Sequence, residues 1–168
     1  MTSICAVIAI AFTTLTPTVR AQSNVTERIG IYDSRAVAVA YAGSSFQQAK
    51  MSDLVSQQKK AKAAGDKREI ARLEAEGRAW QAQLHRQGFG TAPVDDLLAH
   101  ISNELPKIQT DASVTQIISK WNQPELKRHK NAEQIDVTMK LVDAFHPSER
   151  QRQHAIEIQK KKPAKLKE

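Results

Sequence analysis

Two apolar stretches open the periodic part of the chain. Residues 29–32 are short, apolar and partly β-branched, which predicts a strand. Asp33 and Ser34 follow, and both are good N-cap residues, so a helix is expected to begin near Arg35. Residues 36–41 are apolar on all sides and would also suit an extended strand. We favour the helix, with an interruption at residues 43–44.

Residues 45–86 carry a polar helical pattern with narrow apolar stripes. The first stripe consists of Met51, Leu54, Val55 and Ala61. The second steps by three and four residues, which is a period near 3.5, and consists of Ile70, Leu73, Gly77, Trp80 and Leu84. Stripes of this kind predict helices that pack against each other along one face.

A helix break is expected between the two stripes. Gly65 suits the left-handed conformation that ends a helix, and Asp66 is a good cap for the next one. Two helices with facing stripes and a short turn would form an antiparallel helical hairpin, an arm of about residues 45–86. The alternative is one continuous helix that tolerates the glycine.

A further helix is predicted after residues 87–93, where the pattern breaks. Residues 88–90 suggest a hinge, Thr91 is a candidate N-cap, and Pro93 suits a first helical turn. Pro106 lies late in this helix and is expected to kink or end it. The apolar stripe of the helix consists of Val94, Leu97, Leu98, Ile101, Leu105 and Ile108.

The remaining pattern predicts a second strand, a last helix and a tail. Residues 114–121 are rich in β-branched side chains and read as the strand, and residues 127–131 as a basic loop. Asp136 is a candidate N-cap for the last helix, which Pro147 ends. Its apolar face consists of Val137, Leu141, Val142 and Phe145. Residues 147–168 are expected to be a disordered basic tail.

The fold class expected from this order is α+β and predominantly helical. A small β body would comprise residues 27–44 and 87–146, with the helical hairpin arm protruding from it. The strand residues Ile29, Ile31, Ile117 and Ile118 would support the body. Two short strands do not close a core. Several copies of the chain that pool their strands would solve this problem.

The first 21 residues differ from the rest. Residues 4–12 are an apolar run of signal-peptide length, too short to span a bilayer. We expect a cleaved signal peptide over residues 1–21, with the cut after Ala21; the alternative is an uncleaved N-terminal anchor. Cleavage would remove Cys5, the only cysteine, so disulfides and cysteine-based sites are excluded from the exported chain.

The positive net charge favours weak attraction of acidic molecules over a broad surface, in preference to binding at one specific anionic site. The chain has 25 Lys and Arg against 18 Asp and Glu, a formal charge of +7. Removal of Arg20 with the signal peptide leaves +6. The positive residues are spread over the predicted arm, loop and tail, so no nucleic-acid partner is expected. The tail either contacts an anionic membrane surface or simply remains solvated.

No residue pattern indicates catalysis. Gly88-Phe89-Gly90 lacks the Lys-Ser/Thr of a phosphate loop. Asp96 and His100 stand one helical turn apart, which suits a surface contact better than a catalytic dyad. No two histidines share a ligand spacing; they are His85, His100, His129, His146 and His154. We therefore expect no enzyme activity, no catalytic residues, no metal and no cofactor.

The order of elements resembles the Skp/OmpH family of periplasmic chaperones. The resemblance covers about residues 27–146 and begins at the first strand, Arg28-Ile29-Gly30-Ile31-Tyr32-Asp33-Ser34. It includes the polar arm with its tip Ala64-Gly65-Asp66-Lys67, the helix end Ile108-Gln109-Thr110, and Ile135-Asp136-Val137-Thr138 opening the last helix. The arm looks shorter than is usual in the family, and the tail after Pro147 extends beyond the family's usual end.

The resemblance implies a periplasmic, trimeric holdase that binds unfolded outer-membrane or other exported proteins without ATP. Client contacts are expected from the arm stripe, namely Met51, Leu54, Val55, Ile70, Leu73, Trp80 and Leu84. Electrostatic steering of clients is expected from Lys59, Lys60 and Lys62. The alternative is an envelope scaffold or coiled-coil protein with one specific partner and no chaperone activity.

Overall fold

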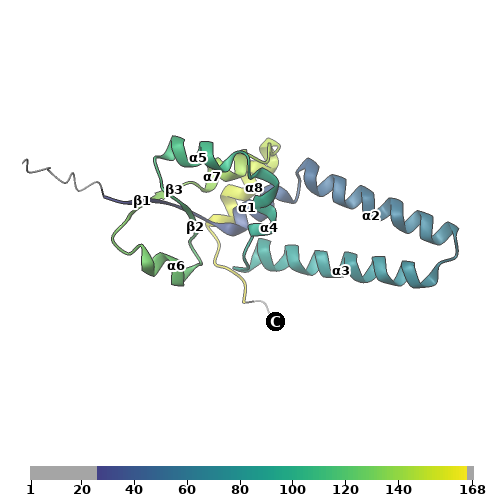
Figure 1. Cartoon of the computed structure of the whole chain (residues 1–168). Coiled ribbons are helices and arrows are strands. Elements are labelled where there is room, and N and C mark those ends of the chain that lie inside the picture. Colours follow the sequence, from purple (N-terminus) through teal and green to yellow (C-terminus); the bar gives the residue numbers. More distant parts are fainter. Residues whose placement is uncertain (1–25, 166–168) are drawn as a thin grey trace, which may run out of the picture.

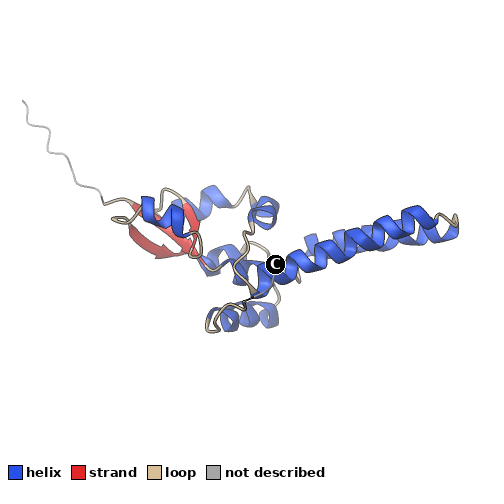
Figure 2. Cartoon of the chain, turned by 90° about the horizontal axis from the view of Figure 1, so that it is seen from below, coloured by secondary structure: helices blue, strands red, loops and turns tan. Residues whose placement is uncertain are grey.

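The computed structural model describes residues 26–165, which are mostly helical with one small parallel sheet (Figures 1 and 2). This confirms the expected α+β, predominantly helical class. The predicted signal peptide lies outside the described residues. The elements are β1 (Arg28–Tyr32), α1 (Ser34–Tyr41), α2 (Ser45–Ala63), α3 (Lys67–Phe89), α4 (Asp95–Leu98), η1 (Ala99–Ile101), α5 (Leu105–Ala112), β2 (Ile117–Ser119), α6 (Gln123–Arg128), β3 (Glu133–Asp136), α7 (Thr138–Asp143) and α8 (Glu149–Gln159).

The sheet has the order β2-β1-β3, with both outer strands parallel to β1. In this register, Gly30 of β1 lies opposite Ile117 of β2 on one side and opposite Ile135 of β3 on the other. A hydrogen bond of 3.0 Å from the Asp33 amide to the Thr138 hydroxyl joins the end of β1 to the start of α7. The sheet therefore brings together three parts of the chain that are far apart in the sequence.

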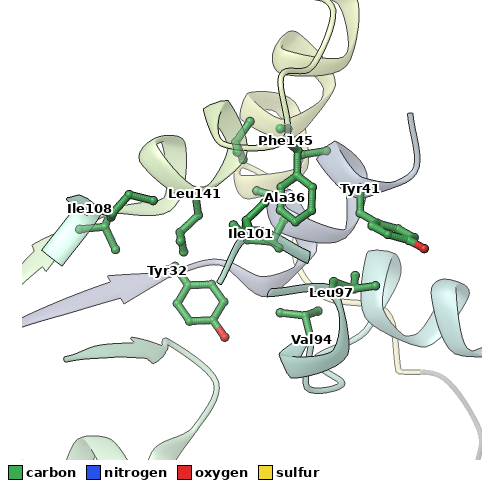
Figure 3. Close-up of a cluster of buried hydrophobic side chains, with 14 of the residues drawn as sticks. Tyr32, Ala36, Tyr41, Val94, Leu97, Ile101, Ile108, Leu141 and Phe145 are labelled. Carbon is green, nitrogen blue, oxygen red and sulfur yellow. The ribbon is translucent and has the colours of Figure 1, made fainter. Parts of the chain in front are cut away.

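The core lies around α1, which is buried on nearly all sides. Asp33 caps this helix, because its side chain accepts a hydrogen bond from the Arg35 amide. The helix predicted after Ser34 is thereby confirmed. Figure 3 shows apolar side chains from the sheet, α1, α4 and α7 converging on one cluster. Its labelled members are Tyr32, Ala36, Tyr41, Val94, Leu97, Ile101, Ile108, Leu141 and Phe145.

Helices α2 and α3 run side by side away from the sheet and the core helices (Figure 1). The helix break expected at Gly65 is confirmed: this residue has φ +66°, and the Asp66 side chain accepts from the Glu69 amide at 2.9 Å. Helix α3 ends at Phe89, beyond the expected limit near residue 86. At the other end, the His100 ring stacks on both Tyr41 and Phe46, on either side of the α1–α2 junction.

The prediction of a single helix over residues 94–108 is wrong. The segment consists of α4, the short 3₁₀ helix η1 and α5. Pro106 stands in the first turn of α5, where a missing amide costs nothing, so it begins a helix instead of ending one. Neither Thr91 nor Pro93 belongs to α4, whose N-cap is Val94 without a side-chain hydrogen bond.

The segment after residue 114 also differs from the prediction. Strand β2 is limited to Ile117–Ser119, and α6 occupies part of the predicted basic loop. Asp136 ends the unpredicted strand β3; its carboxylate accepts from the Thr138 amide at 2.8 Å at the start of α7. Asp136 thus stabilises the start of the predicted helix by accepting from its first residue, although the N-cap position itself is occupied by Val137.

The prediction of a disordered tail is wrong for the described residues after Pro147. Ser148 and Gln151 form a capping box at the start of α8. This helix packs along α1 and buries Ala155 completely. Beyond it, the Arg35 guanidinium donates to the Lys161 carbonyl at 2.9 Å, and the Ala164 amide donates to the Phe89 carbonyl at 2.8 Å. The C-terminal segment is therefore fastened across the start of α1 and the end of α3.

Candidate functional site: an apolar groove between two helices

An open groove of about 570 Å³ lies between α2 and α3. Its apolar lining consists of Met51, Leu54, Val55, Leu73, Trp80 and Leu84. Its polar lining consists of Gln47, Gln58, Glu74, Arg78 and Gln81. The structure thus brings six of the seven predicted stripe residues together on one surface. This happens because residues three or four apart share a helix face, and the two faces meet where α2 packs against α3.

The groove has a buried floor and an exposed rim. Leu54 and Leu73 form the floor and are 9% and 4% exposed. Met51 and Val55 line the same groove but remain 48% and 42% exposed. Ile70 does not line the groove and packs instead beside the small cluster around Leu73. The stripe therefore divides into residues that hold the two helices together and residues that are free to contact a ligand.

Gly77 keeps one side of the groove open. It lies in α3 among the lining residues, and a Cβ atom added there would meet no other atom within 4 Å. A glycine inside a helix lowers helix stability by about 0.5–1 kcal/mol relative to alanine. No packing requirement offsets this cost at Gly77, whereas the missing side chain widens the groove.

One ion pair joins the two helices beside the groove, and a second one within α3 shares its carboxylate. The Lys50 ammonium lies 2.7 Å from the Glu76 carboxylate across the α2–α3 interface, and Arg72 contacts the same carboxylate at 3.1 Å. The hydrogen bond from Lys50, with the charges of both cations, lowers the pKa of Glu76. Because the network is partly exposed to solvent, it adds little to the free energy of unfolding.

The predicted steering residues Lys59, Lys60 and Lys62 are all exposed in the last part of α2. Within residues 26–165, no carboxylate lies within ion-pair distance of any of the three. Lys60 and Lys62 also lie in the last helical turn, where positive charge offsets the helix dipole. Their charge is thus available at the far end of the groove and also favours the helix.

A second cluster of polar residues, which sequence analysis missed, lies at the end of β1. The buried Asp33 carboxylate pairs with the Arg35 guanidinium at 2.7 Å and with the Lys120 ammonium. Burial opposes ionisation of Asp33, yet hydrogen bonds from both cations hold its pKa below the usual value. Both cations also lie over the Trp121 ring, at 5.2 and 4.8 Å from its centroid. The sequence did contain one signal that could have indicated this cluster, namely Arg35, a charged residue directly before the apolar run of residues 36–41.

The described residues give few other indications of chemistry. Within residues 26–165, no three His, Cys, Asp or Glu side chains gather in a way that could hold a metal ion. No helix in that range combines the length and the apolar character needed to cross a bilayer. The predicted strand residues Ile29 and Ile118 are buried, whereas Ile31 and Ile117 are only partly covered.

Comparison of the chain with models of protein families, with curated proteins and with solved structures found no match.

Proposed function

We propose that the chain is an exported holdase that binds apolar segments of unfolded outer-membrane or other envelope proteins without ATP, and that the α2–α3 groove is its client-binding surface. The observation that carries this proposal is the exposure of apolar side chains along the groove. Met51 and Val55 stay about half exposed although they lie beside the packed residues Leu54 and Leu73.

The chemistry of the groove suits many weakly related clients. The Met51 side chain is flexible and polarizable, so it adapts to clients of different shape. Leu84 and Trp80 add partly exposed apolar surface on the opposite wall. Such contacts are individually weak and non-directional, which favours retention of an unfolded chain over recognition of one sequence. Release of the client then needs no nucleotide, since it follows from competition with the client's own folding.

We further propose that the α2–α3 pair acts as a protruding arm and that three copies of the chain assemble through their sheets. Two features support the assembly. The sheet has only three short strands with two open edges in the described chain, and Ile31 and Ile117 are incompletely covered. Size-exclusion chromatography with light scattering on the chain lacking residues 1–21 tests this: a trimer mass supports it, and a stable monomer rules it out.

The function itself is tested by suppression of aggregation. An unfolded outer-membrane protein is diluted from denaturant into buffer with a several-fold molar excess of the chain and no ATP, and light scattering is followed. A lower scattering signal supports the holdase. No effect, together with capture of one folded envelope partner by the same groove, favours the alternative of an envelope scaffold.

A further inference from the structure

The apolar stripe of α3 is almost symmetric about Gly77, which lies near the middle of this helix and lines the α2–α3 groove. Its other members stand seven and four positions before Gly77 and three and seven positions after it; they are Ile70, Leu73, Trp80 and Leu84. A stripe with this spacing matches itself, to within one residue, when a second copy of the helix is laid against it in the opposite direction.

Gly77 leaves room for a second backbone. A Cβ atom added at this position would meet nothing within 4 Å, so no neighbour among the described residues requires a glycine there. A glycine inside a helix is destabilising, and close approach of another backbone is one reason to find one. Met51 and Val55 stand about half exposed in the same groove. A helix seated over Gly77 would cover both of these side chains.

The charges beside Gly77 are self-complementary. Glu74 and Arg78 line the groove one helical turn apart, and Gly77 lies between them in the sequence. Their contact within the chain is long, at 3.9 Å, and among the described residues neither side chain forms another ion pair. When two copies of α3 cross in opposite directions at Gly77, each Glu74 meets the Arg78 of the other copy. A parallel arrangement would set like charges opposite each other.

The lysines at the end of α2 also favour opposite directions. Lys59, Lys60 and Lys62 are exposed, and no carboxylate in residues 26–165 lies within ion-pair distance of them. Two copies laid parallel would bring these lysines together, and their charges would repel each other. In the antiparallel arrangement the two groups of lysines lie at opposite ends of the pair.

We propose that the groove is covered by α3 of a second copy of the chain, in a two-fold pairing with Gly77 near the axis and with Glu74 of each copy bound to Arg78 of the other. The two α2–α3 pairs then form a four-helix arrangement that encloses Met51 and Val55. This contact is separate from the assembly through the sheets and does not depend on the holdase function. It uses the same groove as that function, so a client and a second copy exclude each other.

Disulfide formation at the axis tests the pairing. In the full chain with Cys5→Ser, which has no other cysteine, Gly77→Cys places one thiol at the contact. The two thiols can then react, since a disulfide needs Cα atoms within about 7 Å of each other. The control is Ala75→Cys, an exposed position of α3 that does not line the groove. In a glutathione redox buffer we expect disulfide-linked dimers of Gly77→Cys at a micromolar concentration at which the control forms almost none. Equal yields on non-reducing electrophoresis would overturn the proposal.

Charge variants identify the contacts between the copies. One derivative of the Gly77→Cys chain carries Glu74→Lys and is positive at both charged positions, and the other carries Arg78→Glu and is negative at both. Each alone should form about three- to tenfold less dimer than Gly77→Cys itself, because two attractive pairs become repulsive. An equimolar mixture should recover the full yield.

Both derivatives lack the contact between Glu74 and Arg78 within one chain, so recovery in the mixture cannot come from that contact. Recovery therefore assigns the charge pairs to the interface between two copies. A mixture that forms as little dimer as either derivative alone would contradict the proposed pairing.

Discussion

Arg35 binds Asp33 through two hydrogen bonds while both side chains are almost completely buried. The distances are 3.0 Å from Nε to Oδ1 and 2.7 Å from Nη2 to Oδ2, and the side chains are 1% and 0% exposed. The remaining nitrogen of the guanidinium, Nη1, donates to the Lys161 carbonyl. One buried ion pair therefore connects the end of β1, the first turn of α1 and the C-terminal segment.

Substitution of Arg35 by alanine should destabilise the chain strongly. The change leaves the Asp33 carboxylate buried with Lys120 as its one remaining cation, and loss of a partner from a buried pair costs about 3–5 kcal/mol. Urea denaturation followed by circular dichroism measures the free energy of unfolding. Arg152→Ala breaks the more exposed pair with Asp143 and should cost at most about 1 kcal/mol. Equal losses in the two variants would show that burial of the Arg35 pair is energetically unimportant.

Alkaline pH should destabilise the chain through Tyr32. The folded-state pKa of this group is raised to about 12 by burial and by Asp95, above the unfolded value of about 10. The folded state thus favours the protonated phenol, so its contribution is complete below pH 10 and is lost as the pH rises toward 12. Unfolding free energies measured across this range should fall less steeply in Tyr32→Phe than in the parent. Parallel curves would contradict the raised pKa.

Two glycines should respond oppositely to alanine. Gly77 lies in a helix with free space at its Cβ position, so Gly77→Ala should raise the unfolding free energy by about 0.5–1 kcal/mol. Gly65 has φ +66°, a conformation that costs an L-residue about 1 kcal/mol or more, so Gly65→Ala should lower it. Urea denaturation provides both values. A stabilising Gly65→Ala would mean that the turn between α2 and α3 relaxes on substitution.

The elements that were predicted correctly from the sequence are those that depend only on residues close to one another in the chain. Strand β1 is a dense β-branched run followed by the cap residue Asp33, and the break at Gly65 and Asp66 needs only its own turn. Strand β3 has no such signal, since Ile135 is its only apolar residue. It exists because it pairs with β1, where Arg28 and Glu133 also form an ion pair of 2.9 Å. Long-range pairing of this kind is not encoded in periodicity.

The groove shows the same division between local and long-range information. The stripes correctly grouped Leu54, Leu73 and Trp80, because helical spacing alone puts their side chains on facing sides. Helical spacing does not determine how the two helices are rotated about their own axes relative to each other. It is this rotation that leaves Ile70 outside the groove. Helix α8 was missed because it is polar, although Ser148 and Gln151 carried a local capping signal.

Substitutions on the rim and on the floor of the groove should separate binding from folding. Met51→Gln with Val55→Thr changes exposed side chains, so the unfolding free energy should move by no more than about 0.5 kcal/mol while suppression of client aggregation falls. Leu73→Ala empties the buried floor and should cost about 2–5 kcal/mol. Phe89→Gln is the control, since it alters an apolar side chain that is 50% exposed outside the groove. Rim variants that protect clients fully would remove the groove from the mechanism.

Charge reversal at the end of α2 should weaken client capture in a salt-dependent way. In the triple variant Lys59→Glu, Lys60→Glu and Lys62→Glu, acidic client segments are repelled where they were attracted, so association should slow at low ionic strength. The difference from the parent should shrink as salt is added, because exposed charges are screened over about 10 Å at 0.1 M.

The matched control for this reversal changes three other exposed lysines, Lys127, Lys130 and Lys140, which lie in or near α6 and α7 and not on the α2–α3 pair. It alters net charge equally, so a general charge effect would slow both variants to the same degree. Stopped-flow fluorescence with a labelled client gives the two association rates. Slower association in the α2 variant alone assigns steering to that helix end. Equal rates in both variants and the parent would remove electrostatic steering, and would leave the apolar groove as the only determinant of client capture.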